Sequence, residues 1–387
     1  MIKDKINTDY KNSPLGLIPS DWEVKELGSI VKVKHGRDQK SIEVVNGIYP
    51  ILATGGEIGR TNTALYSKPS VLIGRKGTID KPKYMDTPFW TVDTLFYTEI
   101  SNEVLPLWLY FKFETINWYF YNEASGVPSL SASTISKIKF PLPPLPEQKA
   151  IAQVLSTADA AIHTTEKLIA QKELQKKWLM QQLLTGKKRL KGFGGEWKEI
   201  HIKDISKEVS IRNKTDKQLT VLSCTKYDGL VHSLEYWGRK IFSDDISTYK
   251  IVPKNHFAYA TNHIEEGSIG YQNILDEALI SPMYTVFKTD ASINDDFFFK
   301  LLKSHMLIYQ YQNRMEGSID RRGGLRWDAF SIIKIKLPKI EEQTAIAQVL
   351  QVADKEIQLL KEKSDKLKEQ KKGLMQVLLT GKKRLKY

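Results

Sequence analysis

Glycine-rich and acidic segments that could bind a nucleotide are incomplete in this sequence. Segment 192–197 (GFGGEW) follows a predicted helix end rather than a strand, which favours a linker over a dinucleotide-binding loop. The TGKKRL segment that starts at Thr185 lacks the upstream glycine of a phosphate-binding loop, because Gln181 occupies that position. Segment 275–279 (LDEAL) is an acidic pair with no nucleotide-binding motif beside it. None of these segments predicts catalysis.

The histidines and the single cysteine do not have the spacing of a metal site. No two of the seven histidines lie three or four residues apart, so surface or core positions are favoured over metal ligation. Cys224 stands alone, which excludes an internal disulfide and a zinc site built on cysteines. The Asn/Asp-Pro-Pro-aromatic motif expected of an amino-methyltransferase is also missing. The sequence therefore offers no catalytic motif, and we expect no metal site.

Length and charge limit the class of protein. With 387 residues, of which 41% are hydrophobic, the chain can form two or three domains with buried cores. No apolar run approaches the ~20 residues of a membrane span, and no signal sequence opens the chain, so we expect a cytoplasmic protein. The net charge of +13 suggests a nucleic acid as partner. Segments 142–196 and 337–387 carry 9 Lys/Arg against 5 Asp/Glu and 12 against 7, so the remaining blocks are nearly neutral. Specific contacts in those blocks must come from individual side chains.

Polar side chains at predicted strand-to-turn positions are the candidates for such contacts. Arginine can fork onto guanine and asparagine onto adenine in the major groove, whereas lysine mainly meets phosphate. An ordinary polar loop is the favoured interpretation for any single residue, and the clusters are better candidates than their members. They are Arg60, Thr61, Asn62, Arg75, Lys76 and Lys81 in the first block, and Arg239, Lys240, Thr261, Asn262, His263, Arg321, Arg322 and Arg326 in the second.

An internal repeat organises the chain. Residues 142–191 align with residues 337–386 without a gap, with 12 matches in the first 18 positions, 1 in the next 15 and 15 in the last 17. A fainter similarity opens each block, where Trp22 corresponds to Trp197. The sequence therefore predicts a block, a helix, a second block and a second helix. The expected boundaries are 1–141, 142–191, 192–336 and 337–387.

Each repeated segment has the apolar spacing of a long helix. Apolar residues recur in steps of four and three, which is typical of a coiled-coil seam. Prolines precede each seam, and Thr185-Gly186 and Thr380-Gly381 follow it, so two helices of roughly 40 residues are expected. The heptad does not require the ends to be identical, which suggests that both ends meet a common partner. A plain structural coiled coil is the alternative. The seam residues chosen as docking or coiled-coil positions are Leu155, Ile162, Leu179, Leu183, Leu350, Ile357, Leu374 and Leu378.

The two blocks indicate mixed α/β domains. Short apolar runs bounded by glycine and proline predict strands, among them 49–55 and 70–74 in the first block and 256–260 in the second. Segments 105–124 and 295–313 have the length and composition of helices. RKGTID at 75–80 and EEGSIG at 265–270 both place Gly-Thr/Ser-Ile after a strand and predict equivalent turns.

The sequence resembles the DNA-specificity subunits of Type I restriction-modification systems over almost its whole length. The second block lacks the GRKG sequence that the first block has at residues 74–77. The segments that carry the resemblance are SPLGLIPSDWEV (13–24), PLPPLPEQKAIAQVL (141–155) with its copy at 336–350, LLTGKKRLK (183–191) with its copy at 378–386, IGRKGTID (73–80) and TPFWTVDTLFY (87–97).

The resemblance implies a specific architecture and role. It implies two α/β (α+β) target-recognition domains, joined by two long antiparallel coiled-coil helices in a pseudo-twofold repeat, each reading one half of a split, asymmetric site in double-stranded DNA. It also implies that this chain is non-catalytic and binds no cofactor itself. Two methyltransferase subunits would carry S-adenosylmethionine for adenine-N6 methylation, with motor-nuclease subunits joining for restriction. Two alternatives remain open: the specificity portion of a fused methyltransferase or endonuclease, and a coiled-coil adaptor that reads no DNA. The missing methylase motifs disfavour the first, and the two unlike blocks disfavour the second.

Overall fold

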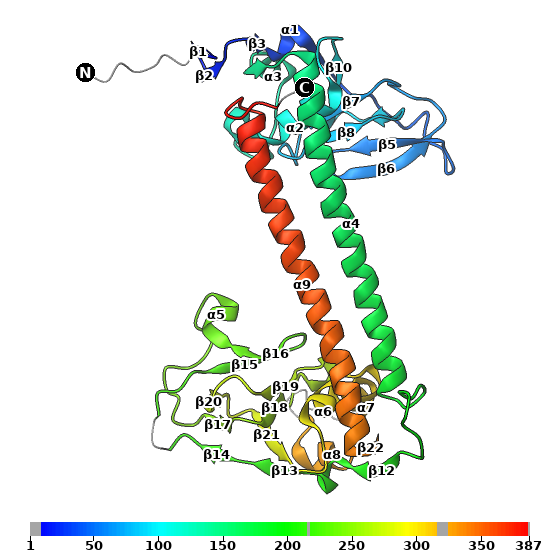
Figure 1. Ribbon diagram of the computed structural model, residues 1–387, viewed down its shortest axis with the longest axis vertical. Helices are drawn as coiled ribbons and strands as arrows, with labels where there is room; N and C mark the ends of the chain where they lie inside the picture. Colours follow the sequence, from blue (N-terminus) through cyan, green and yellow to red (C-terminus); the bar gives the residue numbers. More distant parts are fainter. Residues whose placement is uncertain (1–8, 215–216, 316–323, 386–387) are drawn as a thin grey trace, which may run out of the picture. The chain divides into compact units, whose positions relative to one another are not determined.

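The computed structural model describes residues 9–214, 217–315 and 324–385 (Figure 1). The chain forms two compact units, and each is described here by itself. Unit 1 ends at Lys167 and resumes at Lys361, whereas unit 2 runs from Leu168 to Leu360. We call residues 9–142 the first head and residues 197–337 the second head. Within the described residues, no helix is both long enough and apolar enough to cross a membrane.

Two long helices come from the repeated segments. Helix α4 spans Leu145–Leu183 and helix α9 spans Ile340–Leu378, each with 39 residues. Gly186 and Gly381 follow the helix ends with φ of 69° and 73°, the left-handed conformation in which glycine terminates a helix without strain. The apolar spacing and the Thr-Gly signals therefore predict both helices and both helix ends.

The heads contain the same central sheet. In the first head the strand order is β4-β10-β7-β8, and in the second it is β13-β21-β18-β19, with every pair antiparallel. Apolar strands such as β7 and β18 occupy internal positions of these sheets, where both neighbours satisfy their backbone groups. The two heads thus share one core topology. The bounds are β4 Val31–Lys34, β10 Leu95–Ile100, β7 Ser70–Gly74, β8 Lys83–Met85, β13 Ser206–Val209, β21 Tyr284–Thr289, β18 His256–Ala260 and β19 Ile269–Gln272.

The peripheral strands differ between the heads. The first head adds the sheet β6-β5-β9, in which β5 pairs parallel with β9, whereas the second adds the antiparallel sheet β14-β17-β20 and the hairpin β15-β16. The short helix α5 follows that hairpin. The variation is therefore greatest outside the common core. The bounds are β5 Tyr49–Ala53, β6 Gly56–Thr61, β9 Trp90–Thr91, β14 Ile211–Arg212, β15 Leu222–Thr225, β16 Gly229–His232, α5 Ser233–Trp237, β17 Lys250–Pro253 and β20 Glu277–Ile280.

A two-stranded pair connects each head to its long helix. Strand β3 pairs with β11 just before α4, and β12 pairs with β22 just before α9. Trp22, which directly precedes β3, is fully buried. A further hairpin, β1-β2, occurs in the first head. The bounds are β1 Tyr10–Ser13, β2 Gly16–Pro19, β3 Glu23–Glu26, α1 Leu27–Ile30, β11 Lys139–Leu142, β12 Lys198–His201 and β22 Lys334–Leu337.

The two segments predicted as long head helices are each interrupted. Segment 105–124 forms α2, Pro106–Glu114, and a separate 3-10 turn, Trp118–Tyr121. Segment 295–313 forms α6, Asp295–Leu302, and α7, His305–Met315. Short helices α3, Ala132–Ser136, and α8, Trp327–Ser331, precede β11 and β22. The single-helix prediction was wrong because aromatic residues on both sides of each break pack into the head core, which periodicity alone does not reveal.

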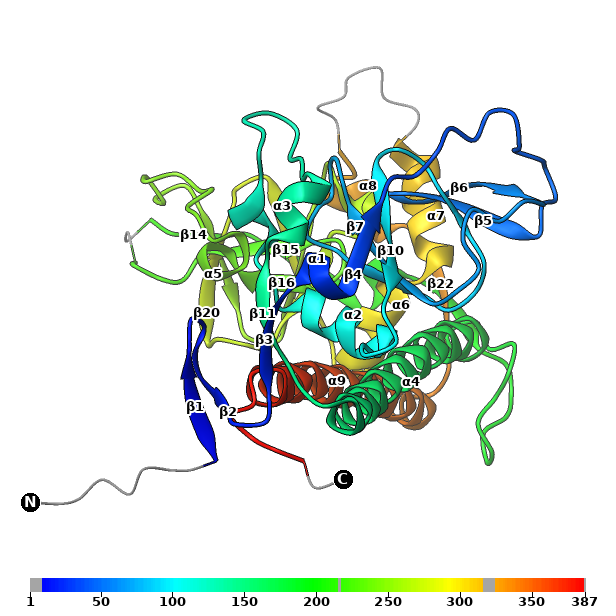
Figure 2. The same ribbon diagram turned by 90° about the horizontal axis from the view of Figure 1, so that it is seen from above.

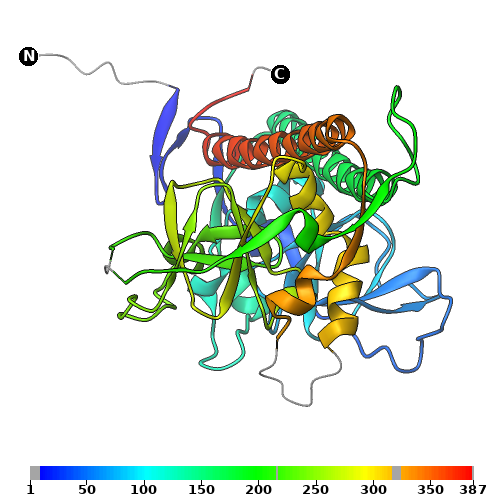
Figure 3. The same ribbon diagram turned by 90° about the horizontal axis from the view of Figure 1, so that it is seen from below.

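The ends of the long helices contribute to the cores of the heads. Leu155 and Leu378 belong to the core of the first head, and Leu183 and Leu350 belong to the core of the second. Leu374 and Leu179 pack against the same two cores. These seam residues therefore pack into the cores of the heads as well as lying on the long helices. In each unit the head lies to one side of α4 and α9, as seen for the first head in Figure 2 and for the second in Figure 3.

Ion pairs show that the helix segments run antiparallel within each unit. In unit 1, Lys371 of α9 lies 2.7 Å from Asp159 of α4 and 3.2 Å from Glu114, and Lys368 lies 2.7 Å from Glu166, further along α4. In unit 2, Lys172 of α4 lies 2.7 Å from Glu356 of α9, and Lys176 pairs with the earlier Asp354, which also accepts from Lys300. Burial raises the pKa of the Asp354 carboxyl, but hydrogen bonds from the two lysines outweigh it, so this pKa lies below its ordinary value. Lysines thus occupy seam positions because aspartates at repeated positions pair with them.

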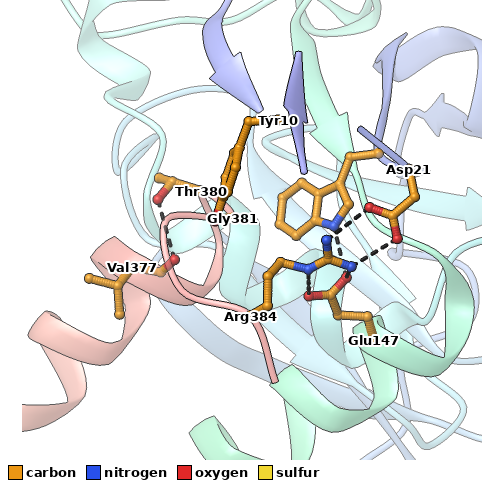
Figure 4. A network of polar contacts seen from close by, with 8 residues as sticks. Tyr10, Asp21, Glu147, Val377, Thr380, Gly381 and Arg384 are labelled. Carbon is orange, nitrogen blue, oxygen red and sulfur yellow. Dashed lines mark hydrogen bonds and ion pairs between the residues drawn. The ribbon is translucent and has the colours of Figure 1, made fainter. Parts of the chain in front are cut away.

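A partly exposed ionic cluster in unit 1, which we call the first clamp, joins the segment after α9 to the buried Glu147 of α4 (Figure 4). Arg384 donates through Nε to Oε1 of Glu147 at 2.6 Å and through Nη2 to Oε2 at 2.8 Å. It also donates to both carboxylate oxygens of Asp21, at 2.9 and 2.8 Å. The indole of Trp22 donates to Glu147 at 2.8 Å. The bonds to Glu147, followed by those to Asp21, raise the pKa of Arg384 well above its ordinary value.

Unit 2 repeats this arrangement in a second clamp. Arg189 donates through Nε and Nη2 to the two oxygens of Glu342, both at 2.5 Å. In place of the aspartate, the carbonyls of Gly195 and Gly194 accept from Arg189 at 2.6 and 3.0 Å. The GFGGEW segment is therefore a connector that supplies carbonyl acceptors. The identical GKKRLK ends thus have a partner within the chain, namely the repeated glutamate.

The repeated glutamine beside each glutamate holds the start of a head helix. Gln148 accepts from the backbone N–H of Leu105 at 2.7 Å and donates to the carbonyl of Pro143 at 2.9 Å. Gln343 accepts from Asn294 at 2.8 Å and donates to Pro338 at 3.0 Å. Both amides are buried, so loss of either would leave unpaired backbone groups. The Glu-Gln motif is accounted for by contacts within each unit.

Candidate functional site

The end of strand β7 forms a corner with the segment before α3 in the first head. The backbone N–H of Leu130 donates to the carbonyl of Arg75 at 2.9 Å, which brings α3 and its N-cap residue Ser131 beside Arg75. The Arg75 guanidinium forms an ion pair with Asp93 and donates to the Asp93 carbonyl at 3.2 Å. The Arg75 side chain keeps 32% of its surface exposed. We call Arg75, Asp93 and Ser131 the first corner.

The second head has the same corner with different side chains. The backbone N–H of Leu325 donates to the carbonyl of Thr261 at 2.7 Å, which brings α8 and its N-cap residue Arg326 beside Thr261. The Thr261 hydroxyl donates to the carbonyl of Met283 at 3.1 Å. We call Thr261, Met283 and Arg326 the second corner. Because Thr261 follows β18 as Arg75 follows β7, these two residues occupy equivalent positions.

The turns after these strands, RKGTID and EEGSIG, correspond only in part: Gly77 lies three residues beyond β7, whereas Gly267 lies seven residues beyond β18 and follows a 3-10 turn, Ile264–Glu266. Gly77 has φ of 90° and Gly267 has φ of 92°, a conformation that favours glycine. Ile79 and Ile269, two residues further along, are both fully buried. The heads therefore share the backbone hydrogen bond of the corner and a left-handed glycine, whereas the length of the turn and the side chains at the corner differ.

A cavity of about 970 Å³ lies in unit 1, lined among others by Leu17, Phe120 and the buried Lys112. The Lys112 ammonium donates to the carbonyl of Leu379 at 3.2 Å, just beyond the end of α9. Burial lowers the pKa of Lys112 to about 8. This lysine therefore has a structural partner at the helix end.

A smaller cavity of about 430 Å³ opens at the second corner. Thr261 and Arg326 both line it, together with Lys250, Glu208 and Asp328. The Lys250 ammonium donates to the carbonyl of Tyr284 at 2.6 Å, so it is held by the sheet. Thr261 and Arg326, which belong to separate clusters in the sequence, thus line one cavity in the structure.

Arg60, Thr61 and Asn62 of the first head lie at and just beyond the end of β6, beside a loop that their own contacts stabilise. Arg60 donates to the carbonyls of Gly47 and Ile48, at 2.9 and 3.1 Å, and Asn62 accepts from the backbone N–H of Ile48 at 3.2 Å. Thr61 is fully buried. These contacts give all three residues a structural role.

The remaining predicted contact residues lie at the surface or near it. Lys76, Lys81, Arg239, Lys240 and Arg326 are exposed, and Asn262 is half-buried. Lys240 pairs with Asp244, and His263 lies 3.7 Å from Glu266. Arg321 and Arg322 lie outside the described residues.

Sequence reasoning missed a group of exposed aromatic residues in the second head. Tyr227, Tyr236 and Trp237 are 78%, 46% and 49% exposed, and they lie close to Arg239 and Lys240 in the chain. The signal was present as tyrosine and tryptophan interleaved with basic residues, a composition typical of nucleic-acid contacts.

One group of potential metal ligands occurs among the described residues. Donor atoms of His263, Glu265 and Glu266 lie within 4.8 Å of one another. All three come from one turn and are at least partly exposed, an arrangement that is common without an ion. This group does not support a metal site.

Several repeated residues are exposed in both copies and have no role in the clamps. In unit 1, Gln153 of α4 is exposed, as are residues near the end of α9 and beyond it. Their copies in unit 2 are exposed as well. The pairs are Gln153 and Gln348, Gln175 and Gln370, Lys177 and Lys372, Gln181 and Gln376, Lys187 and Lys382, and Lys188 and Lys383.

Comparison with known proteins agrees with this repeated organisation. The chain is 25% identical to the Type I restriction enzyme MjaVIII specificity subunit of Methanocaldococcus jannaschii, covering 95% of this chain and 94% of that protein. It is 27% identical to the EcoDI specificity subunit of Escherichia coli over 40% of this chain and 35% of that one.

Solved structures show the same fold. The Type-I restriction-modification S subunit of M. genitalium matches with a TM-score of 0.61 and 15% identity, covering 92% of this chain and 96% of that chain. The HsdS subunit of Thermoanaerobacter tengcongensis matches with a TM-score of 0.52 and 15% identity, over 94% and 98%. Residues 19–174 and 194–369 each match the Type I restriction modification DNA specificity domain. The chain therefore belongs to the family of Type I restriction-modification DNA-specificity proteins and contains two copies of its domain.

Proposed function

We propose that each head reads one half of a bipartite, asymmetric DNA site for a Type I restriction-modification complex. The observation that carries this proposal is the pair of corners. Two heads with one sheet order place different side chains at the same backbone position, and each of these side chains is at least partly exposed. A scaffold that is constant and side chains that vary suit two domains that read different sequences. A non-reading adaptor would not need the corners to differ.

In this proposal, α4 and α9 form an antiparallel coiled coil that separates the two heads, residues 1–141 and 192–336, in a pseudo-twofold arrangement. The antiparallel ion pairs within each unit support it, since Lys371 meets Asp159 and Lys176 meets Asp354. The equivalent clamps support it as well, because each joins the end of one long helix to the start of the other. The seam would then set the distance between the half-sites.

The proposed partners are two methyltransferase subunits, which carry S-adenosylmethionine for adenine-N6 methylation, and motor-nuclease subunits for restriction. The specificity chain itself takes no part in the chemistry, and the complex acts on cytoplasmic DNA. A solved structure from work on complex assembly of a Type I restriction-modification system has the same fold as this chain, with a TM-score of 0.56. Two partners of one kind require two similar surfaces, and the exposed repeated residues supply one set in each unit.

Adenine methylation across a genome tests the proposed function. Cells that carry the methyltransferase subunits are compared with and without this chain. We expect methylation of a motif with two defined halves and an undefined spacer, only when the chain is present. The same methylated sites in both strains, or one continuous motif, would contradict the proposal.

Native mass spectrometry tests the docking surfaces. Lys372→Glu with Lys382→Glu alters the unit 1 set, and Lys177→Glu with Lys187→Glu alters the unit 2 set. Each double variant should bind one methyltransferase subunit where the unaltered chain binds two. Lys363→Glu is the matched control, because this exposed lysine has no copy in the other helix. A saturated complex with one methyltransferase in the unaltered chain would contradict two docking surfaces.

A further inference from the structure

The two corners differ by an exchange of residue types between equivalent positions. In the first corner the residue after the strand is Arg75 and the helix N-cap is Ser131. In the second corner the residue after the strand is Thr261 and the helix N-cap is Arg326. Each corner thus has one arginine and one hydroxyl, on opposite sides of the same backbone hydrogen bond.

The environment of each arginine suits recognition of a base edge. Asp93 holds Arg75 through its Nη1, which leaves the Nε and Nη2 edge for a further acceptor. Arg326 is exposed beside the open cavity that Thr261 also lines. Guanine offers the O6 and N7 acceptors that a forked guanidinium matches in the major groove. The exposed Lys76 beside Arg75 can meet phosphate, which positions the head without reading the sequence.

We propose that Arg75 in the first head and Arg326 in the second each select a guanine, and that the exchanged positions make the two half-sites different. This inference rests on the proposed function, because it assigns base-reading residues within the two heads. An arginine that approaches from the strand side reaches a different base from one that approaches from the helix side. The hydroxyl residue at the other position leaves room for the base edge. Both corners can therefore bind a guanine through an arginine guanidinium and still recognise different DNA sequences.

The test is methylome sequencing of the complex reassembled with Arg75→Ala or Arg326→Ala. Loss of a bidentate arginine should reduce discrimination about 10- to 100-fold at one position of one half-site. The other half-site should stay unchanged, and the two variants should affect opposite halves. Lys32→Ala and Lys207→Ala are matched controls, because these exposed lysines lie at the far end of β4 and β13 from the corners. Both controls should keep the full motif.

Two further variants separate base reading from folding. Arg75→Lys keeps the charge but not the fork, so it should lose selection at the same position while methylation continues. Arg75→Thr with Ser131→Arg gives the first corner the arrangement of the second, and it should move the preference to another position of that half-site. An unchanged motif in Arg75→Ala and Arg75→Lys, or abolished methylation in both, would overturn the inference. Failure of the proposed function has a different signature, namely no chain-dependent motif for the unaltered protein.

Discussion

The guanidinium of Arg384 makes two hydrogen bonds to Glu147, a carboxylate that is fully buried 237 residues earlier in the chain. Arg189 makes the same two bonds to Glu342 in unit 2. The segment that follows each long helix therefore contains an arginine that meets the glutamate at the start of the other helix. The two repeated segments end in the same GKKRLK sequence, which suggested a common external partner. The bonds from Arg384 and Arg189 to the repeated glutamates explain this identity by contacts within the chain. In the proposed complex, the repeated residues that contact the methyltransferase subunits are therefore the exposed ones, such as Gln153 and Gln348.

Removal of the first clamp should destabilise unit 1. Arg384→Ala leaves Glu147 buried without its cation, and we expect a loss of about 2–3 kcal/mol, less than for a fully buried pair because the Arg384 side chain is 30% exposed. Thermal and urea unfolding measure this loss. Lys383→Ala is the control, because this neighbouring lysine is exposed. Equal shifts in the two variants would show that the clamp adds no stability.

Reversal of charge at Lys371 should weaken the helix pair of unit 1. The side chain is 14% exposed and lies between Asp159 and Glu114, so Lys371→Glu would place three carboxylates together. We expect a loss of about 2 kcal/mol, measured by chemical unfolding. Adding Asp159→Lys should restore part of it, whereas Lys372→Glu, on the exposed face, should change little. Absence of any rescue would mean that the ion pair does not stabilise the pairing.

The buried Lys112 should make stability depend on alkaline pH. Burial lowers its pKa from 10.5 to about 8, so the folded chain disfavours the charged form that the unfolded chain keeps up to about pH 10.5. The free-energy cost of keeping the buried Lys112 charged destabilises the folded state fully below pH 8. This destabilisation disappears as the pH rises to about 10.5. Lys112→Met also removes the hydrogen bond to the Leu379 carbonyl at every pH, so its stability relative to the unaltered protein should be more favourable at pH 7 than above pH 10, by up to ~3 kcal/mol.

Melting curves of Lys112→Met and the unaltered protein between pH 7 and 10.5 measure this difference. Lys149→Met, at an exposed position, is the control and should show no pH-dependent difference. A constant difference between Lys112→Met and the unaltered protein across this range would contradict the charged-lysine account.

Much of the frame follows from local sequence. The heptad spacing and the Thr-Gly ends predict α4 and α9, since both signals lie within the helices themselves. Strands β7 and β18 match the predicted runs 70–74 and 256–260 because short apolar stretches between glycines and turns favour buried strands. Local patterns were sufficient where the structure depends on neighbours in the chain.

The clamps and the corners depend on residues that are far apart in the chain. Nothing near Arg384 indicates that Glu147 would meet it, and nothing near Thr261 indicates that Arg326 would lie beside it. The polar cluster at Arg60 looked like a contact site, but its hydrogen bonds to the carbonyls of Gly47 and Ile48 became evident only in the folded loop. Sequence composition identifies polar groups, whereas the fold decides which of them are already occupied.

Lengthening both helices should lengthen the spacer of the DNA site. Seven residues inserted after Ala170 in α4 and after Glu362 in α9 preserve the seam and add about 10 Å of helix. At about 3.4 Å per base pair, the two halves should stay the same with two to three more base pairs between them. Melting curves check that the variant folds, and methylome sequencing reads the spacer. An active variant with the original spacer would show that the helices do not set the distance.

Exchange of one head tests the central claim most directly. Residues 20–141 are replaced by the corresponding head of another member of the family, and methylated adenines are mapped in cells that carry the methyltransferase subunits. Because the two heads have separate cores and share only the helical frame, we expect one half of the methylated motif to change and the other half to stay the same. A change in both halves, or in neither, would contradict independent reading by the two heads.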